Sequence, residues 1–185
     1  MEKNVDIAKE LPKWFVMNAY KCENKAEDIL KGEMGMEYFI PKRYEVRKYA
    51  GKMKRVLVPV IPNLVFVRAL YSDLELFKHK YPFLRYVTCR IDGANRILKV
   101  PDAQMANFIK ASSHYEEELT YYTPEEIQLS KGTRVRVVGG TFNGVEGALL
   151  KVKGKRSKRV VISIDGIMAL SIAEIEPEFI QVLKD

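Results

Sequence analysis

The sequence predicts an α+β protein with two parts: an α/β sandwich on an antiparallel sheet, then a small five-stranded β-barrel. Two patterns predict these parts. Apolar strands alternate with amphipathic helices through residue 112, whereas the last 57 residues are short alternating strands separated by glycine-containing turns. A third observation, an acidic stretch between them, predicts that a linker joins the two parts.

Charge divides the chain at the same places. Residues 1–112 carry a net charge of +8, residues 113–128 carry −5 and residues 129–185 carry +4. We therefore expect an N-terminal extension over 1–12, a first domain over 13–112, a linker over 113–128 and a barrel domain over 129–185. The alternative is that 113–128 forms a helix or strand docked on a neighbouring domain, anchored by Tyr121 and Tyr122.

The first domain is expected to alternate its elements. Ser72 and Asp73 are expected to cap a helix, and Ala50-Gly51 is expected to form a hairpin turn. The expected strands cover 13–20, 37–49, 53–60, 63–70, 83–90 and 95–100, and the expected helices cover 23–35, 72–80 and 101–111.

The strand over 63–70 has an unusual entrance. Pro59, Pro62 and Asn63 precede or open the most apolar run of the chain, where a central strand should not carry two prolines. This rigid apolar step is either a packing element or a surface for a partner.

The barrel strands are expected over 133–139, 145–152, 159–165, 167–172 and 178–183. Phe142 is expected to project from a loop, and Asn143-Gly144 to supply turn residues with positive φ. This pattern resembles the KOW motif of ribosomal proteins and transcription elongation factors. The matching residues are Gly132, Val135, Val137, Gly140, Phe142, Gly144 and Gly147.

The first domain contains, in this order, the stretches "KWFVMNAYKCENKAEDIL", "YFIPKRYEVR", "VPVIPNLVFVRA" and "RYVTCRIDGANRILKVPDAQMANFI". Together they resemble the N-terminal domain of the NusG family, and the two domains follow one another in the family order over roughly 13–183. The resemblance implies an apolar patch that docks on the clamp helices of RNA polymerase. The implied residues are Trp14, Phe15, Asn18, Tyr20, Ile61, Pro62, Asn63, Leu64, Phe66, Phe83 and Tyr86. The alternative is that most of them are core.

The step departs from the housekeeping pattern, with Ile61 for an aromatic residue, Asn63 for glycine and Leu64 for tyrosine. The Asn resembles the paralogue RfaH, and the compact architecture with an N-terminal extension resembles the UpxY-type antiterminators of capsular polysaccharide operons. The resemblance therefore implies a specialised antiterminator. Its alternatives are a general housekeeping NusG factor and a ribosome-associated KOW protein that binds RNA.

Residues 42–55 contain seven Lys and Arg, one acid and two tyrosines. Such a hairpin suits phosphate contacts and stacking on unpaired bases, and the family places this region near upstream or non-template DNA. The expected nucleic-acid contacts are Lys21, Lys25, Lys42, Arg43, Arg47, Lys48, Lys52, Lys54 and Arg55. The alternative is a solvated hairpin without a ligand. The basic run 151–159 is either an RNA contact or a soluble loop.

Composition limits the remaining classes. The chain has a net charge of +7, no signal-peptide pattern and no window near the roughly 18 apolar residues of a membrane span, so a cytoplasmic protein is expected. Cys22, Cys89, His79 and His114 stand in no metal-binding or catalytic spacing. We expect no enzyme activity, cofactor or metal. The resemblance implies a ribosomal protein or the termination factor Rho as the partner of the barrel.

Overall fold

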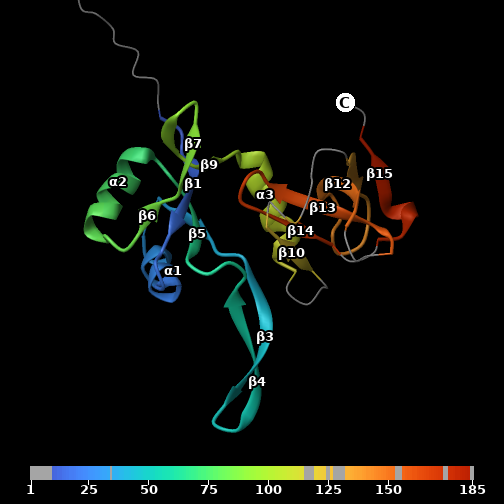
Figure 1. The fold of residues 1–185 in the computed structure, drawn as a ribbon, viewed down its shortest axis with the longest axis horizontal. Coiled ribbons are helices and arrows are strands. Elements are labelled where there is room, and N and C mark those ends of the chain that lie inside the picture. The colour runs from blue at the N-terminus through green and yellow to red at the C-terminus, as the bar shows by residue number, and fades with distance from the viewer. Residues whose placement is uncertain are drawn as a thin grey trace, which may run out of the picture. The chain divides into compact units, whose positions relative to one another are not determined.

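The computed structural model describes residues 10–33, 35–114, 119–123, 126, 132–152, 156–172 and 175–183. The chain forms two compact units (Figure 1). One unit consists of Met1–Phe39 and Asn63–Lys99, and the other of Ile40–Pro62 and Val100–Asp185. The mixture of helices and antiparallel sheets is the predicted α+β class. No helix in the described residues is long and apolar enough to cross a membrane.

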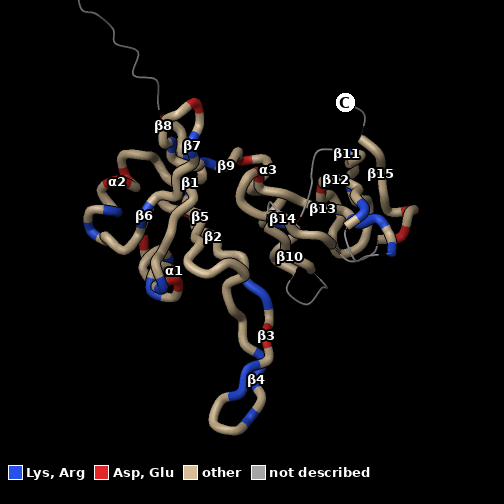
Figure 2. Tube along the Cα trace, in the orientation of Figure 1, with Lys and Arg blue, Asp and Glu red and all other residues tan. Residues whose placement is uncertain are grey.

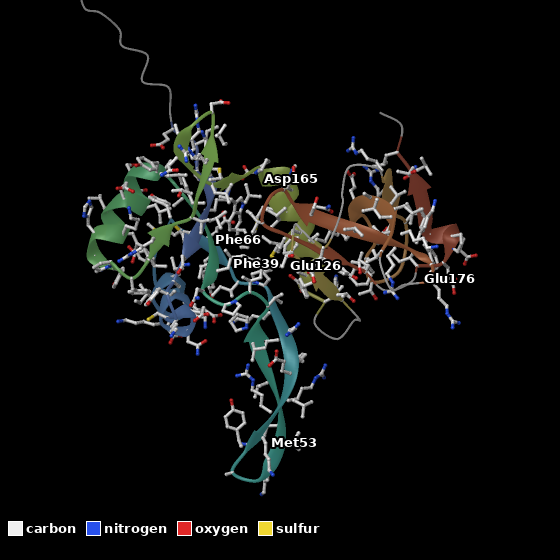
Figure 3. The ribbon with its side chains drawn as sticks, in the orientation of Figure 1. Phe39, Met53, Phe66, Glu126, Asp165 and Glu176 are labelled. Carbon is white, nitrogen blue, oxygen red and sulfur yellow. The ribbon has the colours of Figure 1, made fainter. Side chains whose placement is uncertain are left out.

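A sheet of order β2-β5-β1-β6, to which β9 adds on β1, forms the centre of the first unit. Its strands are β1 (Lys13–Asn18), β2 (Glu37–Phe39), β5 (Leu64–Ala69), β6 (Arg85–Tyr86) and β9 (Lys99–Val100). β1 pairs antiparallel with β5, so that Val16 lies opposite Phe66, and β2 places Phe39 opposite Phe66 on the other edge (Figure 3). β5 is therefore a central strand, and the two prolines are compatible with this position because both precede Leu64, its first residue.

Two helices of the first unit bury one face each. α1 (Glu23–Lys31) buries Ala26 and Leu30, and α2 (Tyr71–Lys80) buries Leu74 and Phe77. The expected cap of α2 is wrong, because the helix begins at Tyr71 and its N-cap is Leu70, two residues before Ser72, without a side-chain hydrogen bond. Asp73 lies instead in the first turn, where its charge complements the helix dipole.

The strand expected over 83–90 is divided in two. β6 ends at Tyr86, and β7 (Thr88–Ile91) then pairs with β8 (Ala94–Ile97) as a separate hairpin. Val87 lies between them and joins the two sheets, because its N–H donates to Val16 O and its carbonyl accepts from Leu98 N. The 95–100 stretch likewise divides into β8 and β9.

The hairpin of β3 (Lys42–Tyr49) and β4 (Lys52–Pro59) is a two-stranded ribbon whose strands pair only with each other (Figure 1). Ala50 and Gly51 have φ of +46° and +80°, the signs that a type I′ turn requires at both central residues. The predicted turn is confirmed, and every pair from Lys42–Pro59 to Tyr49–Lys52 is in register.

The barrel sheet has the order β10-β14-β13-β12-β11-β15. Its strands are β10 (Thr120–Tyr122), β11 (Thr133–Val137), β12 (Glu146–Lys151), β13 (Lys158–Ile164), β14 (Met168–Ser171) and β15 (Ile180–Val182), the last preceded by the 3-10 helix η2 (Pro177–Phe179). The five expected strands are present. β10 is additional and lies in the expected linker, where it pairs with β14 as the docked-strand alternative requires. Residues 115–118, 124, 125 and 127–131 lie outside the described residues.

The third helix, α3 (Asp102–Ser112), packs against β13 of the barrel, whereas the sequence placed this helix in the first domain. The Asn107 side-chain amide accepts from Glu146 N at 2.8 Å and donates to Glu146 O, and Gln104 donates to Asp165 at 2.8 Å. Glu146 lies beyond the last residue of β12 that pairs with β13. The amide therefore satisfies backbone groups that β13 leaves unpaired.

Candidate functional site

Asn63 connects the apolar step to the turn that follows β1. We call residues Asn18–Glu23 the Tyr20 turn. The backbone carbonyl of Asn63 accepts from Ala19 N at 2.7 Å, and its side-chain carbonyl accepts from Lys21 N. Its N–H donates to the carboxylate of Glu23. Three separate groups of one residue therefore hold the Tyr20 turn against the start of β5.

The conformation of Asn63 explains the departure from glycine. Asn63 has φ of +68°, in the left-handed region that glycine adopts freely and asparagine adopts more readily than other residues. Glycine could supply the conformation but not the side-chain carbonyl that Lys21 N uses. Asparagine at this position thus adds a contact to the turn while keeping its geometry.

The structure separates the residues implied for polymerase docking by exposure. The side chains of Trp14, Phe15 and Phe66 are buried, with at most 5% of their surface exposed. These three are core residues, which is the alternative reading of the patch. Asn18, Tyr20 and Pro62 are exposed, and Ile61, Asn63, Leu64, Phe83 and Tyr86 are half-buried. Only the last two groups can offer contact area to a partner.

The buried Phe15 belongs to an aromatic cluster with Tyr71 and Tyr86. Its ring centroid lies 6.2 Å from that of Tyr71 and 5.7 Å from that of Tyr86, and the two tyrosines stack at 6.1 Å. Burial raises the pKa of the Tyr86 phenol, and the neighbouring Glu75 carboxylate raises it further. Tyr86 therefore stays neutral throughout the physiological pH range.

Lysines lie over the aromatic rings of this unit. Lys78 Nζ lies 4.4 Å from the Tyr86 ring centroid, and Lys25 Nζ lies 5.2 Å from that of Phe83. These cation–π contacts were not foreseen, because they join residues on different elements. Lys21 and Lys25 have the i, i+4 spacing of a helix face, but α1 begins only at Glu23 and Lys21 has φ of +61°. The two lysines do not form a helical pair.

The register of the hairpin assigns each of its basic residues to a face, because directly opposed residues share a face. The basic face carries Arg43, Glu45, Arg47, Tyr49, Lys52 and Lys54, together with Val56 and Val58. Figure 2 shows Lys and Arg along both strands, with the acidic position on β3. Four of the seven expected cationic contacts of the hairpin thus share one face, and Lys42, Lys48 and Arg55 lie on the other.

Glu45 is the acid of the basic face. Arg43 and Arg47 each approach its carboxylate to 3.0 Å, and their hydrogen bonds lower the pKa of Glu45. Glu45 therefore remains ionised at neutral pH and neutralises part of the charge of its two neighbours. Because both arginines are exposed and Glu45 is only half-buried, this pairing is screened by salt and adds little to stability.

The opposite side of the hairpin is an apolar face that the sequence analysis did not identify. Its apolar members are Tyr44, Val46, Met53 and Leu57, all among the exposed large apolar residues, and Met53 projects near the tip (Figure 3). Arg55 lies over the Tyr44 ring, with its guanidinium carbon 3.9 Å from the centroid. Pairing the two arms about Ala50-Gly51 would have revealed this face.

The glycines of the KOW pattern have two different structural roles. A Cβ on Gly132 would lie 2.4 Å from Leu150 Cδ2, and one on Gly147 would lie 2.5 Å from the Val161 carbonyl oxygen. Gly140 and Gly144 have φ of +63° and +78°. The first pair therefore permits close packing, and the second pair permits the loop.

Phe142 differs from its expected position. It was expected to project from the loop, but only 7% of its side chain is exposed, and its ring meets the His114 ring edge-on at 5.1 Å. The loop that carries Phe142 is closed by a backbone hydrogen bond in which Gly144 N donates to Val137 O at 2.7 Å. Val135 and Val137 are buried, as predicted.

The basic run 151–159 is described only in part. Residues 153–155 lie outside the described residues, and Lys151, Arg156 and Lys158 are exposed. The described part of the chain contains no group of three or more His, Cys, Asp or Glu side chains that could hold a metal ion.

Comparison with known proteins gives a family. The family model described as "Transcription termination factor nusG" matches residues 12–109. A solved structure described as "Domain interaction in Thermotoga maritima NusG" is 15% identical, covers 94% of this chain and 98% of its own, and superposes with a TM-score of 0.43. No curated protein sequence matches the chain. Because the family model spans more than half of the chain, from β1 into α3, the chain belongs to the NusG family.

Proposed function

We propose that the chain is a transcription elongation factor that binds the clamp helices of RNA polymerase and suppresses pausing and termination. NusG-family proteins are non-enzymatic transcription factors that bind RNA polymerase. The observation that carries the proposal is the family match over residues 12–109, which includes the apolar step and the Tyr20 turn. We infer no enzyme activity for this chain.

The proposed docking surface consists of exposed and half-buried residues around the step. Ile61 and Leu64 are half-buried, Pro62 and Tyr20 are exposed, and the register of β1 with β5 places the buried Trp14 and Phe66 on the same sheet face as Leu64. A factor that binds the closed clamp better than the open clamp shifts polymerase away from paused states, and this shift requires no chemical step.

The hairpin is proposed to contact upstream DNA or the displaced non-template strand. Its basic face offers Arg43, Arg47, Lys52 and Lys54 to phosphates, with Tyr49 beside them for stacking on unpaired bases. The KOW barrel, residues 129–185, is proposed to recruit a ribosomal protein or Rho.

We further propose a specialised antiterminator, acting at long operons such as capsular polysaccharide loci, rather than a general factor. The support is the Ile61-Pro62-Asn63-Leu64 step, in which Asn63 adds the contact to Lys21 that glycine could not make. Chromosomal crosslinking of the protein alongside RNA polymerase distinguishes the cases. Occupancy at a few long operons is expected. Occupancy across most genes would identify a general factor, and occupancy unrelated to polymerase would indicate the ribosome.

The docking surface is tested by the double substitution Ile61→Asp with Leu64→Asp in the full chain. Both side chains retain partial exposure, so the change should preserve the fold and weaken binding to purified core RNA polymerase at least about tenfold. The control is Leu76→Asp on α2, a side chain that is 71% exposed and lies outside the surface. Unchanged binding of the double variant would refute polymerase docking at this step.

A further inference from the structure

The Tyr20 turn holds two residues with bulky side chains in the left-handed region. Tyr20 has φ of +36° and Lys21 has φ of +61°. Glycine reaches this region freely, whereas a residue with a side chain is strained there. Strained backbone of this kind persists only where the surrounding structure imposes it, and it gathers at functional sites.

Hydrogen bonds to the backbone N–H groups of residues 19–22 hold the turn in this left-handed conformation. The N–H of Ala19 donates to Asn63 O at 2.7 Å, that of Tyr20 to Asn18 Oδ1 at 2.8 Å, and that of Lys21 to Asn63 Oδ1. The N–H of Cys22 closes the turn by donating to Ala19 O at 2.9 Å. Every backbone donor from 19 to 22 is therefore satisfied, and two of the four partners are supplied by Asn63.

The turn displays the Tyr20 side chain to solvent. Tyr20 is 71% exposed, which makes it one of the two most exposed large apolar or aromatic side chains among the described residues. The fold gains little from this ring, because most of its surface stays in water. Glycine or asparagine at position 20 would give the same backbone with less strain.

We propose that the Tyr20 turn is a pre-organised anchor for the polymerase and that Asn63 is its positioning residue. This inference rests on the proposed function, which it deepens by assigning separate roles to residues within the docking surface. An exposed tyrosine with a fixed backbone offers a large contact area with little conformational entropy to lose on binding. Asn63 acts through Tyr20 and does not itself contact the partner.

The central experiment compares binding and stability in the Tyr20→Gly variant of the full chain. Glycine relieves the left-handed strain and removes the ring, so the melting temperature should stay the same or rise, while affinity for purified core RNA polymerase falls at least about tenfold. Tyr20→Phe retains the ring and should bind within about threefold of the original chain. Unchanged affinity of Tyr20→Gly, or a loss of affinity accompanied by a lower melting temperature, would overturn the proposal.

A double-substitution cycle tests the role of Asn63. Asn63→Gly keeps the left-handed conformation but deletes the acceptor of Lys21 N, and it should weaken polymerase binding. If Asn63 acts by positioning Tyr20, the double variant should bind no more weakly than Tyr20→Gly alone. Additive losses would mean that Asn63 contacts the polymerase directly, and would overturn its role as a positioning residue.

Asp92→Gly is the matched control. Asp92 has φ of +51° in the turn between β7 and β8, so the change relieves similar backbone strain away from the docking surface. Its polymerase affinity should equal that of the original chain. The two proposals fail differently: an original chain that does not bind polymerase refutes the proposed function, whereas an original chain that binds and a Tyr20→Gly variant that binds equally refute only the anchor.

Discussion

The barrel loop and the Tyr20 turn use the same left-handed backbone with opposite residue choices. The loop between β11 and β12 places Gly139, Gly140 and Gly144 at positive φ. The Tyr20 turn places a tyrosine and a lysine there; the Tyr20 N–H donates to the side chain of Asn18, and the Lys21 N–H donates to that of Asn63. The barrel loop therefore relaxes its backbone and turns Phe142 inward, whereas the Tyr20 turn accepts strain and turns a large ring outward. In the barrel loop, glycine at positive φ avoids backbone strain. In the Tyr20 turn, tyrosine at positive φ accepts that strain and exposes its ring to solvent.

The largest expected effect tests the structural side of this comparison. Gly147→Val places a Cβ 2.5 Å from the Val161 carbonyl oxygen, a backbone atom that cannot move without disturbing the β12–β13 pairing. We expect a loss of about 3 kcal/mol in the free energy of unfolding, measured by urea denaturation. Gly166→Ala is the control, because its Cβ meets no atom within 4 Å and only its φ of +71° opposes the change, at about 1 kcal/mol. Equal losses would show that close packing at Gly147 is unimportant.

In the hairpin, the face of the ribbon on which a side chain lies, rather than a turn, decides how that side chain is exposed. Replacing Arg43, Arg47, Lys52 and Lys54 with glutamine removes the cations of the basic face. Affinity for single-stranded DNA should fall, and the slope of log affinity against log salt should flatten by up to about 3. Replacing Lys42, Lys48 and Arg55 on the apolar face should have a smaller effect. Equal effects would mean that overall charge, not the basic face, governs binding.

A smaller effect of opposite sign sharpens the contrast between the two turns. Gly140→Ala should lower the free energy of unfolding by about 1 kcal/mol, because alanine is strained at φ of +63°. Lys21→Gly should leave it unchanged or raise it, because glycine relieves the strain at φ of +61°. Both are measured by urea denaturation. If Lys21→Gly destabilises the protein by as much as Gly140→Ala does, the lysine side chain stabilises the fold and the contrast fails.

The smallest expected effect concerns Glu45. The neighbouring Arg43 and Arg47 lower the pKa of this carboxyl, so it is ionised at neutral pH and, under the proposed function, would compete with DNA phosphate for both guanidinium groups. Glu45→Gln should raise affinity for single-stranded DNA by less than about threefold in low salt, with the difference vanishing in high salt. Electrophoretic mobility shift at two salt concentrations measures it. A lower affinity would show that Glu45 orders the two arginines for binding.

Much of the fold follows from local patterns in the sequence. The turn at Ala50-Gly51, the five barrel strands and the buried Val135 and Val137 were all predicted, because alternation and turn residues act over a few positions. The errors arose where the deciding partner is distant. Ser72 and Asp73 do not cap α2, which starts earlier, and between a linker and a docked strand at Thr120–Tyr122 only the pairing with β14 decides for the strand.

The sequence by itself determined the α+β class, the glycine positions of the barrel and the charge of the hairpin, because these depend on side-chain type and short-range spacing. Only the tertiary structure decided which of the implied docking residues are exposed, which face of the hairpin each base occupies, and that Tyr20 and Lys21 are left-handed. The hydrogen bond from Lys21 N to Asn63 Oδ1 joins residues 42 positions apart in the sequence, so no local sequence pattern predicts it. A strained backbone conformation persists only where contacts with distant residues impose it, so it can be identified only in the folded structure.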